Sequence, residues 1–338
     1  MLLYQQNDPS MESQWRAIIL FGRNVASYKF AFAHSLLELA SKEKNFISLD
    51  ELSIPFSKYI IEHIRKNDKQ GTSPSSTFLD TCRKYISGEI NQNDLLSATQ
   101  RLGFINVVDA FHIVGREAVP IKFYEKNYSN KQKGLVITDE LLKLKDSIQF
   151  NNFDSEIEAR WDLVETAWNL NLSPNLLNVD YDDDGELFYI KTNQMRRVDI
   201  TSARDSLNGY QKGKCFYCYR NIIILKGEDD IAHIDHFFPH KNKLFHQANI
   251  NGVWNLVLSC QECNHSKIAN IPDIKYLRRL STRNEYFIES HHPLRETLIN
   301  QTGNDKTKRD NYLLVQDKIA IENSIHRWKP KMELEASF

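Results

Sequence analysis

This chain of 338 residues lacks the sequence features of membrane-spanning, secreted, strongly basic and repeat proteins. No apolar run approaches the roughly 20 residues that a bilayer span requires, and the opening MLLYQQNDPSMESQWR lacks the charged-then-apolar plan of a secretory signal. The formal net charge is -1, so the whole chain carries no basic excess that would point to nucleic acid. Internal repeats and low-complexity tails are also lacking. We therefore expect a cytoplasmic protein without a membrane partner, long enough for two or three domains.

Cysteine is scarce, yet four of the five cysteines form two Cys-x-x-Cys pairs, Cys215/Cys218 and Cys260/Cys263. Two thiolates separated by two residues can bind one ion from a tight turn, and two such turns complete the tetrahedron that structural zinc prefers. A redox pair, or small residues buried by chance, is the alternative. The pairing favours a structural Zn²⁺ site. Because the segment between the pairs is far longer than a zinc ribbon needs, we expect it to carry a function of its own.

The segment between the pairs has the pattern of two strands and a helix. From Ile222 onward the chain is rich in β-branched and apolar side chains, and residues 232–239 predict a strand that ends in a turn at the proline. A second apolar stretch, residues 255–260, follows after a loop, and a short helix is expected from Cys263. Charge supports this reading only weakly, because residues 201–285 contain 12 lysines and arginines against 8 acidic residues.

Within this pattern, Asp235 and His236 are followed by Asn255 and then by Asn264, directly after the last cysteine. This arrangement closely resembles the HNH endonuclease signature of the ββα-metal superfamily, over roughly residues 210–272. The three letters of the signature fall on His236, Asn255 and Asn264, so the chain resembles a variant that ends in Asn where many members have His. The resemblance implies a metal-dependent endonuclease, and thus a phosphodiester hydrolase.

The residue types also suit that chemistry. Hydrolysis of a phosphodiester needs a water deprotonated near neutral pH, which makes His236 the candidate general base. A hard divalent ion, Mg²⁺ or Mn²⁺, would stabilise the charge on the transition state, and Asp235 and Asn264 would hold it. Asn255 has no useful acid or base chemistry, and the resemblance gives it the role of hydrogen-bonding across the loop to fix the geometry of His236.

Neighbours on a regular strand point to opposite faces, so Asp235 and His236 converge on one phosphate only if the strand ends or distorts there. His233 shares a face with Asp235, which leaves it as an alternative metal ligand, a phosphate contact or a packing residue. Lys267 is a candidate phosphate contact, with an ordinary solvated helix lysine as the alternative. Arg204 is a third candidate nucleic-acid contact, on a helix expected over residues 196–209.

The rest of the chain has helical periodicity. We expect a mostly α protein with a small α+β, zinc-stapled ββα-metal module. Residues 1–195 would form a helical region for target recognition or partner binding, residues 196–272 the module, and residues 273–338 a helical C-terminal region. Ser48 to Glu51 predicts a capping box that opens a helix, and residues 134–138 predict a strand.

These features predict a DNA endonuclease with structural Zn²⁺ and catalytic Mg²⁺ or Mn²⁺, with a protein partner or activator on the N-terminal region as a further expectation. Residues 283–298 show a weaker resemblance to segments that accompany HNH domains in bacterial phage-defence proteins, which would place the enzyme in antiviral defence or restriction. Two alternatives stay open. The same fold could bind nucleic acid through its zinc-dependent structure without cleaving it. The nuclease could also act on RNA, because metal-assisted hydrolysis does not distinguish ribose from deoxyribose unless a pocket recognises the 2′-OH.

Overall fold

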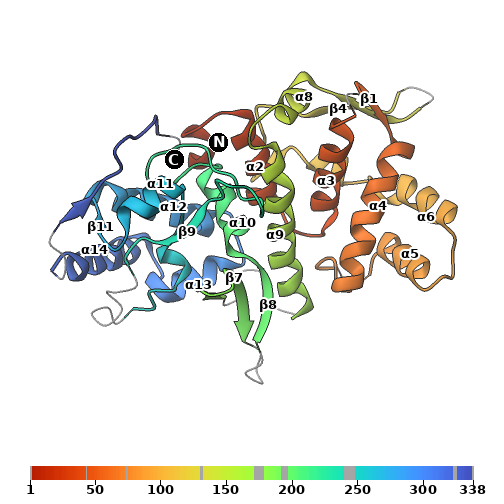
Figure 1. Ribbon diagram of the computed structural model, residues 1–338. Helices are drawn as coiled ribbons and strands as arrows, with labels where there is room; N and C mark the ends of the chain where they lie inside the picture. The colour runs from red at the N-terminus through yellow and green to blue at the C-terminus, as the bar shows by residue number, and fades with distance from the viewer. Residues whose placement is uncertain are drawn as a thin grey trace. The chain divides into compact units, whose positions relative to one another are not determined.

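The computed structural model describes residues 2–42, 44–73, 75–129, 132–170, 179–191, 197–239, 248–322 and 326–336 (Figure 1). Over these residues the protein is mostly helical with small two- and three-stranded sheets, as the sequence predicts. The chain divides into two compact units, Met1–Asn171 and Leu172–Phe338. The three-part division expected from the sequence differs from this, since both of its boundaries, near residues 195 and 272, fall inside the second unit.

The first unit is built mainly from helices. Its helices are α1 (Leu3–Gln6), α2 (Met11–Phe21), α3 (Tyr28–Ala40), α4 (Leu49–Lys66), α5 (Thr77–Ile86), α6 (Gln92–Ala98), α7 (Val107–Ala110), α8 (Asp139–Lys145) and α9 (Phe150–Asn169), with a π-helical turn at Thr99–Gly103. Its strands are β1 (Phe46–Ser48), β2 (Ile113–Val114), β3 (Glu117–Ala118), β4 (Tyr124–Asn127) and β5 (Gly134–Ile137). Strands β1, β5 and β4 form one antiparallel sheet in that order, and β2 and β3 form a hairpin.

Helix α4 begins at the capping box that the sequence predicts. Ser48 Oγ accepts a hydrogen bond from the Glu51 amide at 3.2 Å, and Glu51 Oε2 accepts one from the Ser48 amide at 3.0 Å. Two of the amides that have no intrahelical partner are satisfied in this way, which confirms the prediction. Helix α3 packs against both α4 and α9, and the stacked rings of Phe30 and Trp161 lie between α3 and α9. This packing fixes the relative positions of the three helices.

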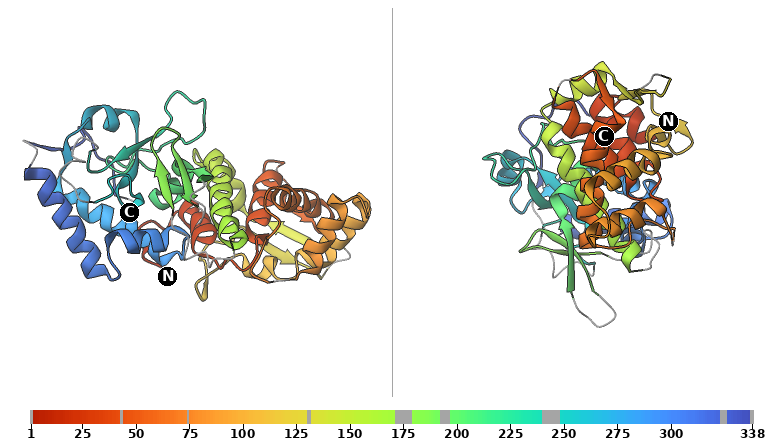
Figure 2. Two further views of the ribbon diagram at one scale, coloured as in Figure 1. Left: turned by 90° about the horizontal axis from the view of Figure 1, so that it is seen from below. Right: turned by 90° about the vertical axis from the view of Figure 1, so that its right-hand side faces the viewer.

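The second unit begins with an antiparallel sheet and ends with long helices. Its strands are β6 (Asp180–Asp182), β7 (Leu187–Lys191), β8 (Arg197–Ser202), β9 (His233–His236), β10 (Leu256–Ser259), β11 (Ile271–Pro272) and β12 (Arg327–Trp328). Its helices are α10 (Ala203–Asn208), α11 (Gln261–Lys267), α12 (Ile274–Glu289), α13 (Leu294–Thr302) and α14 (Lys306–Glu322), with 3₁₀ turns at Gly209–Gln211 and Val253–Asn255. Helix α12 packs against α13 and α14, which are drawn in blue in Figure 2.

The helix predicted over residues 196–209 is wrong in its first half. Residues Arg197–Ser202 form strand β8, which pairs antiparallel with β7, and only Ala203–Asn208 are helical. The stretch VDIT carries three β-branched residues, which favour a strand once a partner is available. The pairing of these residues with β7 was the missing information, because it is not visible in the local periodicity.

The C-terminal helices belong with the segment that carries the four paired cysteines, because they hold its backbone in place. Arg279 of α12 donates hydrogen bonds to the carbonyls of Phe216 and Tyr217 at 2.5 and 2.8 Å. Asn284, also on α12, donates to the Trp254 carbonyl at 3.1 Å, and the Leu334 amide donates to the Cys218 carbonyl at 2.9 Å. Since these bonds satisfy buried backbone groups, residues 273–336 and the cysteine segment form one unit. None of the helices in the described ranges has the length and apolar character to span a membrane.

Candidate metal centre and surrounding polar site

Strands β9 and β10 and helix α11 follow one another in the order strand, strand, helix. The two strands are antiparallel, with His236 opposite Leu256 and His233 opposite Ser259. Helix α11 starts two residues after β10, with Cys260 as its N-cap residue. The strand predicted over residues 232–239 is present but shorter than expected, because β9 covers only His233–His236, and a single bridge joins Ile223 to Ile231 before it.

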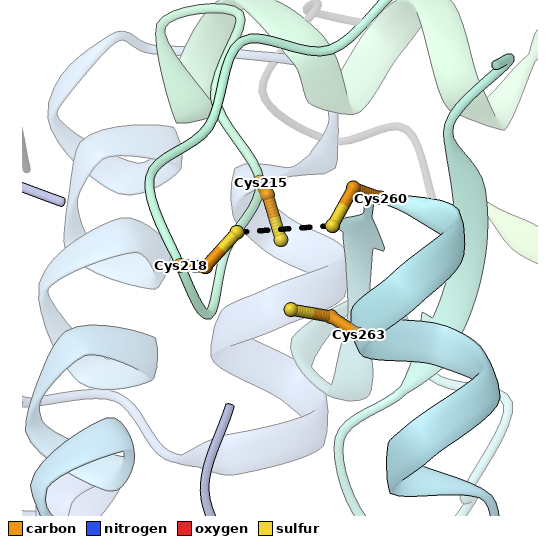
Figure 3. Close-up of side chains that lie close together, drawn as sticks. All are labelled: Cys215, Cys218, Cys260 and Cys263. Carbon is orange, nitrogen blue, oxygen red and sulfur yellow. Dashed lines mark hydrogen bonds between the residues drawn. The ribbon is translucent and has the colours of Figure 1, made fainter. Parts of the chain in front are cut away.

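The four paired cysteines meet at one buried point. Cys215 and Cys218 come from a turn before β9, and Cys260 and Cys263 from the first turn of α11, with all four sulfur atoms pointing toward one another (Figure 3). The sulfur atoms lie within 4.8 Å of one another. Cys218 Sγ and Cys260 Sγ are 3.7 Å apart, too far for a disulfide and close to the ~3.8 Å edge of a tetrahedron with Zn–S bonds of about 2.3 Å. The group fits a structural zinc ion.

The first turn of this cluster is shaped by its own backbone. The Cys215 amide donates to the Arg220 carbonyl at 2.8 Å, and the Tyr219 amide donates to the Cys215 carbonyl at 3.1 Å. Tyr219 closes the turn in the left-handed region, with φ of 61°. This tight turn brings two thiols spaced by two residues onto one side of the chain.

Asp235 lies in a hydrogen-bond network that the sequence did not reveal. Its Oδ2 accepts a hydrogen bond from Tyr217 Oη at 2.6 Å, and its Oδ1 pairs with Lys267 Nζ at 3.0 Å. Lys267 also donates to the His236 carbonyl at 2.8 Å, and its side chain is 0% exposed. Burial, with the Asp235 carboxylate second, raises the pKa of Tyr217 well above its usual value, so the phenol stays protonated and donates.

This network buries Lys267, which the sequence left as either a phosphate contact or a solvated residue. Its ammonium group is buried between Asp235 and a backbone carbonyl, so it is not a solvated helix lysine, and in this arrangement it does not reach out to a phosphate. Arg204 is also buried, where it donates to the Ala232 carbonyl at 2.7 Å and pairs with Glu186. Both side chains act within the unit as cross-links between elements.

The two histidines of β9 have different neighbours. His236 is half-buried, and its ring lies 6.2 Å from that of Tyr181 on β6. His233, also half-buried, lies 5.9 Å from the ring of His265, which is exposed on α11. Helix α11 therefore covers the strand face that carries His233 and Asp235, and His236 is the last residue of β9, at the point where the strand ends.

Asn255 is completely buried just before β10. Its side-chain oxygen accepts from the Phe238 amide at 2.8 Å, and its side-chain amide donates to the carbonyls of Phe238 and Ile250 at 3.0 and 2.9 Å. Its own carbonyl accepts from the Phe237 amide at 2.8 Å. These bonds tie the backbone that follows His236 to the start of β10.

Asn264 is half-buried on α11, three residues before Lys267. Residues three apart lie on one side of a helix, which places Asn264 on the side that faces Asp235. The structure thus brings Asp235, Lys267 and Tyr217 together through direct contacts, and Tyr217 lies between the two cysteines of the first pair in the chain. Sequence analysis missed Tyr217, although its place between two zinc-type cysteines was a signal that its ring would be held close to the strands.

Comparison of the chain with protein-family models, with curated proteins and with solved structures finds no match. The geometry of the residues themselves therefore carries the functional argument.

Proposed function

We propose that this protein is a metal-dependent endonuclease of the HNH type that hydrolyses DNA phosphodiester bonds, with a structural zinc ion on the four cysteines. The observation that carries the proposal is the order of strand, strand and helix, with the HNH letters on its three parts: His236 at the end of β9, Asn255 before β10 and Asn264 on α11. The buried cysteine group joins the turn before β9 to the start of α11.

His236 is the proposed general base. It is the last residue of β9, and the backbone after it is fixed by the hydrogen bonds of Asn255 to Phe238 and Ile250. An imidazole held in this way would take the proton of an attacking water near neutral pH. Asn255 acts as a positioning residue, because it touches only backbone.

The catalytic ion would be Mg²⁺ or Mn²⁺, which takes oxygen ligands and stabilises charge on the phosphoryl oxygens and the leaving group when it is bound. The donor types of Asp235 and Asn264 suit such an ion. Each oxygen of Asp235 uses one lone pair for Tyr217 or Lys267 and retains another. The Lys267 ammonium, 3.0 Å from Oδ1, opposes the binding of a second cation at that oxygen by charge repulsion.

The alternative is a zinc-dependent nucleic-acid-binding module that does not cleave. The pairing of Asp235 with a buried lysine favours it, because a carboxylate engaged in this way can serve the fold alone. The two functions make different predictions for His236, since a binding module does not need a base. DNA is the proposed substrate, and the test includes RNA as a second substrate.

The test is cleavage of supercoiled plasmid and of labelled single-stranded RNA by the zinc-loaded chain in Mg²⁺ or Mn²⁺, with EDTA as a control. The decisive variant is His236→Ala, and the matched control is His265→Ala, because His265 is exposed on α11 of the same module. We expect plasmid cleavage by the wild type and by His265→Ala, and a loss of about 10²–10⁴-fold in His236→Ala, the usual contribution of a general base.

All variants must retain one zinc ion per chain for the comparison to hold. Plasmid binding without cleavage by any of the proteins would replace the nuclease with the binding module. Cleavage that His236→Ala leaves unchanged would remove His236 from the mechanism, and cleavage of RNA alone would change the substrate class.

A further inference from the structure

A second group of metal-ligand side chains lies in the first unit, among helices α3, α4 and α9 (Figure 1). His63 comes from the last turn of α4, and Glu158 and Asp162 are one turn apart on α9. One ligand atom from each of the three lies within 4.8 Å of the other two. Residues four apart on a helix share a face, so both carboxylates face α4.

The ring of His63 is held in one orientation. Its Nδ1 lies 2.8 Å from Glu165 Oε2, and the ring stacks on Trp161 with centroids 3.4 Å apart and planes 4° apart. Glu165 is 1% exposed and also accepts from Asn67 Nδ2 at 2.6 Å and Gln70 Nε2 at 2.8 Å. A carboxylate with these donors is an acceptor for the Nδ1–H of His63, which leaves Nε2 to face the cluster.

Nε2 of His63 lies 3.1 Å from Glu158 Oε2. In a neutral ring with its proton on Nδ1, both of these atoms are acceptors, so a proton or a metal ion must lie between them. The distance suits a metal ion, because two ligands bound at about 2.1 Å and roughly 90–109° apart are separated by ~3.0–3.4 Å. Lys66 Nζ donates to the other oxygen of Glu158, Oε1, at 2.7 Å, so Oε2 is left to bind the ion.

Asp162 and His34 complete the surroundings of Glu158. The half-buried Asp162 carboxylate converges on the same point as Glu158. A proton on His63 Nε2 is shared with one carboxylate oxygen, whereas a divalent ion at this point would bind both carboxylates. His34, 5% exposed on α3, has a buried Nε2 without a hydrogen bond, 3.7 Å from Glu158 Oε2.

We propose that His63, Glu158 and Asp162 bind a divalent first-row transition-metal ion, with Glu165 as the residue that orients the His63 ring. One imidazole and two carboxylates form a mixed nitrogen and oxygen ligand set, which suits Mn²⁺, Fe²⁺ or Zn²⁺ better than Mg²⁺ or Ca²⁺. The carboxylate that binds the far nitrogen of a ligating histidine is the usual outer partner in such sites. Glu158 is 36% exposed, which provides a path for the ion.

The probe is Mn²⁺, titrated into the full chain with zinc already bound at the four cysteines, because thiolates prefer zinc and carboxylates accept manganese. Continuous-wave electron paramagnetic resonance measures affinity and stoichiometry. Pulsed measurements detect coupling to ¹⁴N, which an imidazole ligand gives. The nuclease site is proposed on the oxygens of Asp235 and Asn264, and Asp235→Asn removes its carboxylate without changing His63, so the two sites are distinguishable even if the nuclease proposal fails.

We expect one tight Mn²⁺ site with ¹⁴N coupling in the wild type and in Asp235→Asn. Asp162→Asn and His63→Gln should weaken it at least tenfold, and His63→Gln should abolish the ¹⁴N coupling. Glu165→Gln should weaken it about 10–100-fold, as expected for the partner of a ligating histidine. Glu62→Gln is the matched control, because this exposed carboxylate lies next to His63 on α4, and it should bind as the wild type does.

Circular dichroism and one zinc per chain establish that each variant is folded. Binding that persists in Asp162→Asn with unchanged affinity would overturn the proposal. So would a wild type without ¹⁴N-coupled manganese, which would show that a proton alone holds the cluster together.

Discussion

The two clusters of ligand side chains, one in each unit, are built in opposite ways. In the second unit the ligands come as two close pairs on short elements, and the contacting thiols of Cys218 and Cys260 are 42 residues apart. In the first unit His63 and Glu158, whose ligand atoms lie 3.1 Å apart, are 95 residues apart in the chain and come from two long helices. The first kind of site is visible as a spacing in the sequence, whereas the second exists only after α4 and α9 have packed.

Because the two clusters are built differently, a metal ion should have a different effect on the folding of each unit. Strand β9 has only four residues and α11 only seven, so these elements have little stability of their own. Helices α4 and α9 have 18 and 20 residues and bury aromatic side chains whether or not an ion is present. Metal in the second unit should therefore control folding, and metal in the first should follow it.

The largest expected effect comes from breaking the cysteine cluster. Cys263→Ser removes one thiolate, and because structural zinc in small motifs contributes about 10–16 kcal/mol of apparent binding free energy, residues 210–272 should lose their fold. The matched control is Cys82→Ser, which changes an equally buried thiol on α5 of the first unit. Hydrogen exchange read by mass spectrometry checks both variants.

In Cys263→Ser, exchange in β9, β10 and α11 should become fast while α3 and α4 stay protected, and the bound zinc should be lost. Cys82→Ser should keep its zinc and the protection of β9 and β10. Full protection of these strands in a zinc-free Cys263→Ser protein would show that hydrophobic packing holds them. It would contradict the conclusion that the second unit depends on metal for folding and the first does not.

The next effect concerns the ion pair between Lys267 and Asp235, whose side chains are 0% and 9% exposed. Lys267→Met leaves a buried carboxylate without its cation, and Asp235→Asn leaves a buried ammonium without its anion. Removal of one partner of such a pair typically costs about 3–5 kcal/mol, measured here by chemical denaturation of the zinc-loaded protein. The double variant should cost less than the sum of the two, because neither charge is then left alone.

Arg220→Ala is the control for this pair. Arg220 binds Glu262 in the same unit at 3.0 Å, but the two side chains are 46% and 51% exposed, so its loss should cost less than about 1 kcal/mol. Equal costs for Lys267→Met and Arg220→Ala would mean that the buried pair contributes no more than a surface pair.

These features show what the sequence could and could not predict. Each Cys-x-x-Cys pair, like the capping box at Ser48, consists of residues within a few positions of one another, and both the cysteine group and the cap were predictable from these spacings. Strand β8 was mistaken for helix because its pairing with β7 lies outside the local pattern. The catalytic roles of His236, Asn255 and Asn264 remain predictions that the plasmid experiment tests.

Burial was the least predictable property. Lys267 carries the same side chain as any solvated helix lysine, and only the packing of α11 on β9 places its ammonium beside Asp235. Arg204 is similar, since its partner Glu186 is 18 residues earlier in the chain, directly before β7. In the first unit, no local pattern could connect His63 with Glu158, because that contact depends on how two long helices pack.

The smallest expected effect concerns the first unit. Its free energy of unfolding should decrease in acid because of His112, whether or not a metal ion is bound. His112 is 8% exposed, and its Nε2 accepts a hydrogen bond from the Phe123 amide at 3.0 Å, so the ring is neutral in the folded state. Burial, with Lys122 second, lowers the pKa of His112 to about 4. Because the unfolded chain has a pKa near 6.5 for histidine, it binds the proton more readily than the folded chain does. Stability from this group is therefore complete above pH ~6.5 and falls as the pH drops toward 4, by about 3 kcal/mol.

His112→Gln removes the titration, so the difference in the free energy of unfolding between wild type and variant, measured in urea, should shrink by that amount between pH 7 and pH 4. The exposed His265→Gln should leave the acid dependence as it is. An unchanged difference across this range would mean that the ring is charged within the fold, and that the Phe123 amide has another acceptor.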